Sequence, residues 1–138
     1  MKSLFIAGLC LSTLALGFKD LNYDMPMELD AYNFYGTVSS LDTKMLIGDT
    51  AWFIEFYAPW CPHCQKLAPT WDTLYRRNKE KLNVARVDCT SKAGEPVCIR
   101  FGVKGFPTLL YFPVGQKSYH TYHGDRTVEA FEDWVFLE

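Results

Sequence analysis

Two cysteines stand one helical turn apart in the segment Cys61-Pro62-His63-Cys64. The apolar run Trp52–Tyr57 before them predicts a buried strand, and apolar residues with helical spacing follow them. Cys61 is therefore expected at a helix N-terminus, where unpaired backbone N–H groups and the helix dipole stabilise a thiolate. Cys64 lies one turn further on, close enough to form a disulfide with Cys61 or to resolve a mixed disulfide formed on it. The arrangement predicts thiol–disulfide exchange.

The two residues between the cysteines favour the same chemistry. Pro62 is tolerated in the first helical turn, which has no use for its missing N–H. His63, when protonated, favours a thiolate at its neighbour. We therefore expect the pKa of Cys61 to lie below that of an ordinary thiol.

Three other uses of the cysteine pair fit less well. A zinc site needs two more ligands at matching spacing, and Cys89 and Cys98 are too far apart to supply them readily. Haem attachment needs a histidine directly after the second cysteine, where this chain has Gln65. An inert structural disulfide would not require a position between a buried strand and a helix.

Hydrophobic periodicity predicts the elements around the pair. In chain order they are a short strand near Met27–Leu29, a helical stretch to about Lys44, the strand Trp52–Tyr57, a helix from Cys61 to about Lys79 with a kink at Pro69, the strand Leu82–Val87, an antiparallel hairpin of Thr108–Phe112 and Lys117–Tyr122, and a last helix around Val128–Val135 capped by Asp125 or Thr127. This order implies a mixed sheet between helices.

Composition limits the class of protein. The chain has 138 residues, of which 49% are apolar, so it can bury the core of one soluble domain. Its net charge of −2 offers no basic field for a nucleic-acid backbone. We therefore expect no nucleic-acid partner.

Residues 1–17 read as a secretory signal peptide. Lys2 is followed by an apolar stretch too short to span a bilayer and by small residues suited to cleavage. Removing it takes away Cys10 and leaves four of the five cysteines, an even number that suits an oxidising compartment. We expect the endoplasmic reticulum lumen and no transmembrane segment in the mature chain; secretion stays open because Val135–Glu138 is not a KDEL-type retention signal.

Several separated motifs, in this order, resemble a catalytic domain of the protein disulfide isomerases. They are the segment Glu55–Cys64, Leu67-Ala68-Pro69 and Gly105-Phe106-Pro107-Thr108, within a resemblance that covers residues 25–136. The resemblance implies the thioredoxin fold, an α/β fold with a mixed central sheet flanked by helices. Residues 18–138 would form this single domain.

The resemblance also implies roles for individual residues. Cys61 would be the exposed attacking thiol and Cys64 the resolving thiol. Pro107 would be a cis-proline whose loop faces the two cysteines and binds substrate backbone, with Trp60 and Phe106 beside it as further substrate-binding residues.

Two ionisable residues are candidates for support of the thiols. Glu55 is the one charge in an apolar strand, and burying it unpaired would cost several kcal/mol, so it should be partly protonated or linked to water. The resemblance implies that Glu55 exchanges a proton with Cys64; the alternative is a strand-end carboxylate that reaches solvent. Arg126 matches a family arginine that lowers the pKa of the second cysteine, although a plain surface arginine explains it nearly as well.

Cys89 and Cys98 bracket residues 90–97. Several domains of the isomerase family close a structural disulfide at similar places, and we favour that pairing here. Two buried free thiols are the alternative.

The sequence thus predicts a thiol–disulfide oxidoreductase, a disulfide oxidase or isomerase, that needs no metal or organic cofactor. Its partners would be cysteine-containing folding proteins and a redox partner, either an oxidase or glutathione.

The common isomerase motif has Gly and Lys where this chain has Pro62 and Gln65. Cys-Pro-His-Cys is the arrangement of the bacterial periplasmic disulfide oxidase, and Cys-Pro-x-Cys-Gln is similar to thioredoxin-related membrane proteins of the endoplasmic reticulum. The alternatives are a reductase, the truncated ectodomain of such a membrane-anchored protein, and a non-catalytic chaperone domain.

Overall fold

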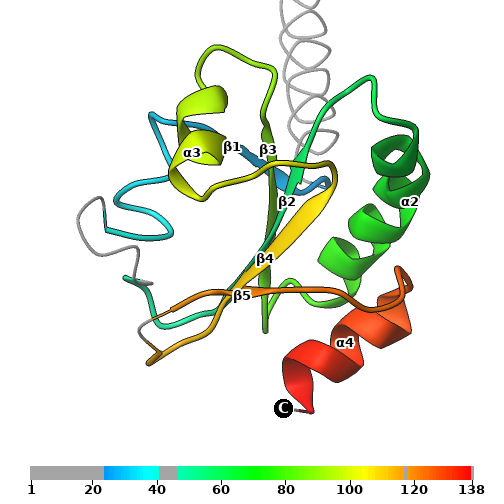
Figure 1. Cartoon of the computed structure of the whole chain (residues 1–138). Coiled ribbons are helices and arrows are strands. Elements are labelled where there is room, and N and C mark those ends of the chain that lie inside the picture. Colours follow the sequence, from blue (N-terminus) through cyan, green and yellow to red (C-terminus); the bar gives the residue numbers. More distant parts are fainter. Residues whose placement is uncertain (1–23, 41–46, 117, 138) are drawn as a thin grey trace, which may run out of the picture.

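A computed structural model describes residues 24–40, 47–116 and 118–137, shown in Figure 1. The predicted signal peptide lies outside these residues. The elements in chain order are β1 (Met27–Leu29), β2 (Trp52–Tyr57), α2 (Pro62–Arg77), β3 (Asn83–Asp88), α3 (Glu95–Arg100), β4 (Thr108–Phe112), β5 (His120–Thr121) and α4 (Val128–Phe136).

The strands form one mixed sheet in the order β1-β3-β2-β4-β5. β3 pairs in parallel with both β1 and β2, whereas β4 pairs antiparallel with β2 and with β5. The predicted mixed sheet is confirmed. The hairpin after β4 is also present, but β5 is shorter than the predicted strand Lys117–Tyr122, of which Lys117 lies outside the described residues.

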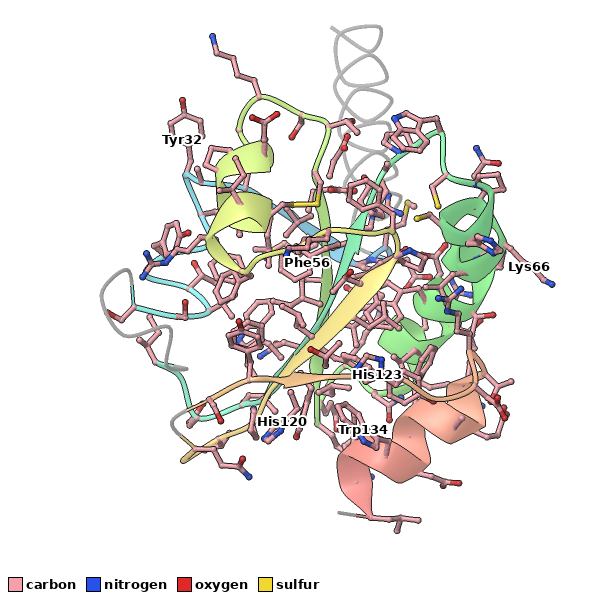
Figure 2. All side chains as sticks on the ribbon, in the orientation of Figure 1. Tyr32, Phe56, Lys66, His120, His123 and Trp134 are labelled. Atoms are coloured by element: carbon pink, nitrogen blue, oxygen red, sulfur yellow. A yellow bond between two sulfur atoms is a disulfide. The ribbon has the colours of Figure 1, made fainter. Side chains whose placement is uncertain are left out.

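Helices cover both faces of the sheet, with α2 and α4 on one side and α3 on the other (Figure 1). β2 runs through the middle and is apolar on both faces, as its sequence predicts. Phe53 packs against Trp71 of α2 and Phe131 of α4, with ring centroids 4.9 and 5.6 Å away. Phe56, labelled in Figure 2, belongs to the core on the α3 side, where its ring centroid lies 6.1 Å from that of Phe101.

The helix predicted to run to about Lys44 is wrong over residues 30–40, which form turns; the rest of that prediction, to Lys44, lies outside the described residues. Short polar side chains bind the backbone here instead. Asn33 Oδ1 accepts from the Asp30 N–H at 2.7 Å, and Asp30 Oδ1 accepts from the Tyr32 N–H at 2.8 Å. Such local hydrogen bonds compete with helix formation.

The sequence interpretation also missed α3. The helix has six residues, begins after Gly94 and contains Pro96, so no apolar periodicity could reveal it.

The two longer helices begin and end close to where the sequence predicts. α2 starts after Cys61, runs through Pro69 without ending and carries Arg76 and Arg77 in its last turn, where cations complement the helix dipole. Of the two caps proposed for α4, Thr127 takes the position, and its hydroxyl accepts from the Ala130 N–H at 3.1 Å.

Candidate active site

The two central cysteines are held at the junction of β2 and α2. Cys61 is the N-cap of α2 and Pro62 follows as its first residue. The Cys64 backbone N–H donates a hydrogen bond to Cys61 Sγ at 3.3 Å, so the N-cap sulfur satisfies one of the unpaired donors of the first turn. Both cysteines are free thiols.

Cys61 and Cys64 lie in a small apolar pocket rather than on the open surface. They are 5% and 4% exposed, and they pack with Ala58 and with the partly buried rings of Tyr57 and Phe106. This differs from the exposed first thiol that the family resemblance implies. The reason is that the Phe106 segment comes over the sulfur: Cys61 Sγ donates to the Phe106 carbonyl at 3.6 Å.

An aromatic face adjoins the reactive sulfur. Trp60 is 66% exposed, and its ring lies edge-to-face with Phe106 at a centroid distance of 5.9 Å. The peptide bond from Phe106 to Pro107 is cis. Trp60, Phe106 and Pro107 are thus brought to one place next to Cys61, which makes them candidates for contact with a substrate chain.

The two thiols differ in acidity. Hydrogen bonds from the Cys64 side chain and from the backbone N–H groups of Cys64 and His63 lower the pKa of Cys61, against the opposing effect of burial, and the charge of Arg126 adds to the lowering. Burial, followed by the hydrogen bond to Cys61, raises the pKa of Cys64 to about 12. Cys61 can therefore ionise while Cys64 keeps its proton, as an attacking and a resolving thiol require.

His63 is exposed on the first turn of α2. Its backbone N–H contributes to the lowered pKa of Cys61. A contribution of its imidazole charge remains a prediction.

Glu55 is buried beneath the cysteines. It is 2% exposed, and burial raises its pKa to about 7, with the charge of Arg86 acting in the opposite direction. The negative charge of Glu55 also raises the pKa of Cys64. A carboxyl that is about half ionised at neutral pH can both accept and return a proton.

Arg126 lies in the exposed segment before α4 and lines, together with Pro107, a cavity of about 260 Å³. Its positive charge lowers the pKa of both Cys61 and Glu55. The family resemblance places such an effect on the second cysteine, whereas here the effect falls on the first thiol and on the buried carboxyl.

Cys89 and Cys98 form a disulfide that joins the end of β3 to α3. The yellow sulfur–sulfur bond is visible beside α3 in Figure 2. The pair is separate from the Cys61 pocket and ties together the side of the domain opposite α2.

Sequence reasoning missed three residues that act near Glu55: Glu28, Arg86 and Asp72. All three influence the pKa of Glu55 by their charge. Arg86 gave a usable signal, since it is the one basic residue in the predicted strand Leu82–Val87, as Glu55 is the one acidic residue in its own. Glu28 and Asp72 gave none, because their neighbours depend on strand register and helix packing.

Within residues 24–40, 47–116 and 118–137, no group of three or more His, Cys, Asp and Glu side chains is placed to hold an ion. Among the helices that the structure describes, none has the length and apolar character to cross a membrane.

Comparison with known proteins identifies the family of this chain. The sequence model of the Thioredoxin family matches residues 28–136. The chain belongs to the thioredoxin family.

Relatives within this family include disulfide isomerase-like proteins. A rice protein (Oryza sativa subsp. japonica), protein disulfide isomerase-like 2-1, is 43% identical over 93 residues, which are 65% of this chain and 25% of the rice protein. The chain thus spans only a minor part of the length of such relatives.

Solved structures agree in fold. The first thioredoxin domain of mouse protein disulfide-isomerase A4 superposes with a TM-score of 0.63 at 31% identity, covering 78% of this chain and 71% of that one. The Trx4 domain of ERdj5 gives a TM-score of 0.65 at 26% identity over 83% of this chain and 95% of that one. The thioredoxin fold expected from the sequence is confirmed.

Proposed function

We propose that this chain is a thiol–disulfide oxidoreductase that oxidises or isomerises cysteines of folding proteins in the secretory pathway. The observation that carries the proposal is the unequal pair of thiols at the start of α2. The pKa of Cys61 is lowered by hydrogen bonds, whereas burial raises the pKa of Cys64 to about 12. The names of the relatives, several of them protein disulfide isomerases, agree with this chemistry.

The reaction begins at Cys61. Its thiolate attacks one sulfur of a client disulfide; the client S–S bond breaks, a mixed disulfide forms, and the leaving client thiolate takes a proton from water. Glu55 as carboxylate then accepts the proton of Cys64. The Cys64 thiolate attacks Cys61 Sγ, the mixed disulfide breaks, and the second client sulfur leaves and is protonated.

The net exchange moves two electrons. The client disulfide becomes two thiols while Cys61 and Cys64 become a disulfide. Run in reverse, the same steps oxidise a client dithiol and regenerate the two thiols of the chain. Isomerisation needs only the first attack and a second attack by another client thiol.

We place the oxidising direction first because every group that stabilises the Cys61 thiolate stabilises the reduced protein and so makes its disulfide a stronger oxidant. Glutathione disulfide or a dedicated oxidase would then restore the Cys61–Cys64 disulfide. The client chain would lie across Trp60, Phe106 and Pro107, whose rings and backbone adjoin the sulfur.

The proposed compartment follows from two features. Residues 1–17 have the pattern of a signal peptide. The Cys89–Cys98 disulfide fits an oxidising environment, of which the endoplasmic reticulum lumen is our first choice.

The direct test uses the oxidised protein and a reduced peptide that contains two cysteines. We expect stoichiometric oxidation of the peptide by the wild-type protein and none by a Cys61→Ala/Cys64→Ala variant. Turnover should appear when glutathione disulfide is added. If the oxidised protein leaves the peptide reduced, while the reduced protein cleaves insulin disulfides, the chain is a reductase.

A further inference from the structure

Three charged side chains lie in register across β1, β3 and β2. Glu28 is aligned with Arg86, and Arg86 is aligned with Glu55. Aligned residues on neighbouring strands point to the same face of a sheet, about 4.8 Å apart from strand to strand. Phe53, two residues before Glu55, packs on α2, so the whole row Glu28–Arg86–Glu55 faces the helix that carries Cys64.

Glu28 holds Arg86 from the outer end of the row. Its Oε1 accepts hydrogen bonds from the Arg86 Nε–H and, at 2.8 Å, from the Tyr57 hydroxyl. The Arg86 guanidinium also lies 5.2 Å from the centroid of the Tyr57 ring. Arg86 is thus fixed by Glu28 and Tyr57 beside the buried Glu55.

The two ends of the row meet different surroundings. Glu55 is 2% exposed, whereas the Glu28 side chain is 49% exposed and lines, with Arg86, a surface cavity of about 710 Å³. Water therefore reaches the Glu28 side chain, which does not bear the desolvation cost that Glu55 bears.

We propose that Glu28 is a positioning residue for thiol–disulfide exchange: by holding and partly neutralising Arg86, it sets the pH at which Glu55 can take the proton of Cys64. The inference rests on the proposed function because the proton transfer from Cys64 matters only if the chain performs thiol–disulfide exchange. The electrostatic coupling of Glu28 to Glu55 is a property of the folded chain alone.

The electrostatic directions agree with this geometry. Arg86 lowers the pKa of Glu55, and Glu28 raises it. Glu28 acts twice, as a like charge and as a competitor for the guanidinium.

Other charged groups that face Glu55 come from α2 and from the segment before α4. Asp72 raises the pKa of Glu55 and Arg126 lowers it, while the thiol of Cys64 lies under the influence of the same carboxyl. On β4 the neighbour aligned with Glu55 is Leu109, which is uncharged. The hydrogen bonds to the Glu28 carboxylate come from Arg86 and Tyr57 rather than from these groups, so a substitution of Glu28 acts on Glu55 through Arg86 and Tyr57.

The coupling would matter for the resolving step. A general base works best when its pKa lies near the ambient pH. Without Glu28, Arg86 would stabilise the Glu55 carboxylate more fully, and Glu55 would become a weaker base for the Cys64 proton.

The test follows the Glu55 carboxyl by NMR in reduced full-length protein labelled with carbon-13 at the glutamate carboxyls. Loss of one signal in Glu55→Gln assigns it. In Glu28→Gln we expect the titration midpoint of Glu55 to move to lower pH by on the order of one pH unit, the size of a charge removed two strands away in a partly buried site.

A matched control removes another acid from the same edge of the domain. Asp24 pairs at 2.7 Å with Lys79, which does not belong to the row. Asp24→Asn changes net charge as Glu28→Gln does, and it should leave the Glu55 midpoint in place. If the Glu55 midpoint moved equally in both variants, the shift would come from the change in net charge alone, and the inference would be overturned.

A conservative variant separates charge from structure. Glu28→Asp keeps the negative charge on a shorter side chain, so its midpoint should lie between those of the wild type and Glu28→Gln. If Glu28→Gln does not fold, an unshifted midpoint in Glu28→Asp is enough to reject the proposal. A folded Glu28→Gln with the wild-type midpoint rejects it as well.

The kinetic counterpart is the pH dependence of mixed-disulfide resolution, whose acid limb should move to lower pH in Glu28→Gln while the plateau falls a few-fold. If Glu28 has only a structural role, the substitution would lower the rate of resolution at every pH and leave the acid limb at the same pH. Failure of exchange with an intact shift in the carboxyl titration would reject the proposed function and leave the coupling standing.

Discussion

The Cys64 backbone N–H donates a hydrogen bond to Cys61 Sγ at 3.3 Å, so the second cysteine helps to prepare the first. Burial and the hydrogen bond to Cys61 raise the pKa of the Cys64 thiol to about 12. One local structure, an N-cap sulfur and the turn behind it, therefore produces opposite acidities in two identical side chains. This asymmetry is the basis for the roles proposed for them.

The roles can be separated by single substitutions. Cys61→Ser should abolish both insulin reduction and dithiol oxidation, because the attacking thiolate is lost. Cys64→Ser should instead accumulate mixed disulfides with client proteins, since nothing remains to release them. Both are read by non-reducing electrophoresis after acid quenching. Equal trapping by the two variants would contradict the assignment.

Glu55 should make the protein less stable as the pH rises. Its pKa is raised from 4.5 in the unfolded chain to about 7 in the fold, so the folded protein binds more protons between these values. Unfolding free energy therefore falls as the pH rises through this window, by about 3 kcal/mol for a shift of this size.

Glu55→Gln tests this linkage because it keeps the shape and removes the charge. The variant should be more stable than the wild type at pH 8, and the difference should shrink towards pH 4.5, as measured by urea unfolding at each pH. The variant should also resolve mixed disulfides more slowly. If the variant turns over normally and its unfolding free energy has the same pH dependence as that of the wild type, Glu55 neither carries a buried charge nor acts as a base.

Hydrophobic periodicity predicted the junction that matters for the chemistry. The continuous apolar run Trp52–Tyr57 and the 3.6-residue spacing after Cys61 are local signals, and both elements lie within a residue or two of their predicted ends. The cis bond before Pro107 could not be read in this way, because only about 5–6% of X–Pro bonds in folded proteins are cis and residues alone do not mark them.

The charged row beneath the thiols shows a different limit. Glu28 and Glu55 lie far apart in the chain, and they share one row with Arg86 only because β3 is inserted in register between β1 and β2. Register depends on the packing of whole strands, which a single sequence does not display. The turns over residues 30–40 were missed for a simpler reason: Asp30 and Asn33 satisfy the backbone themselves.

The Cys89–Cys98 disulfide should be structural and slow to react. The two cysteines are nine residues apart in sequence, and closing a loop of that size in the unfolded chain contributes about 2–3 kcal/mol. Mild dithiothreitol should expose Cys61 and Cys64 to alkylation while Cys89 and Cys98 stay protected, as peptide mass mapping would show. Rapid labelling of Cys89 and Cys98 in oxidised protein would mean that they are free thiols.

The redox potential of the Cys61–Cys64 pair decides between the oxidising and reducing proposals. Thioredoxin lies near roughly −270 mV, protein disulfide isomerase near roughly −180 mV and the periplasmic oxidase near roughly −120 mV. Hydrogen bonds and the charge of Arg126 already lower the pKa of Cys61, and a protonated imidazole at His63 would add to the same stabilisation. We therefore expect a potential above about −220 mV in glutathione equilibria.

Substitution of His63 isolates the part of this potential that comes from its side chain. His63→Ala keeps the backbone N–H that acts on Cys61 but removes the imidazole, so the potential should become more negative and the pKa of Cys61 should rise. His120, an exposed histidine on β5 that is hydrogen-bonded to Gln116, provides the control, and His120→Ala should change neither quantity. Thiolate absorbance and glutathione titration measure the two effects independently. A wild-type potential near that of thioredoxin, unchanged in His63→Ala, would identify a reductase whose first thiol is set by the backbone alone.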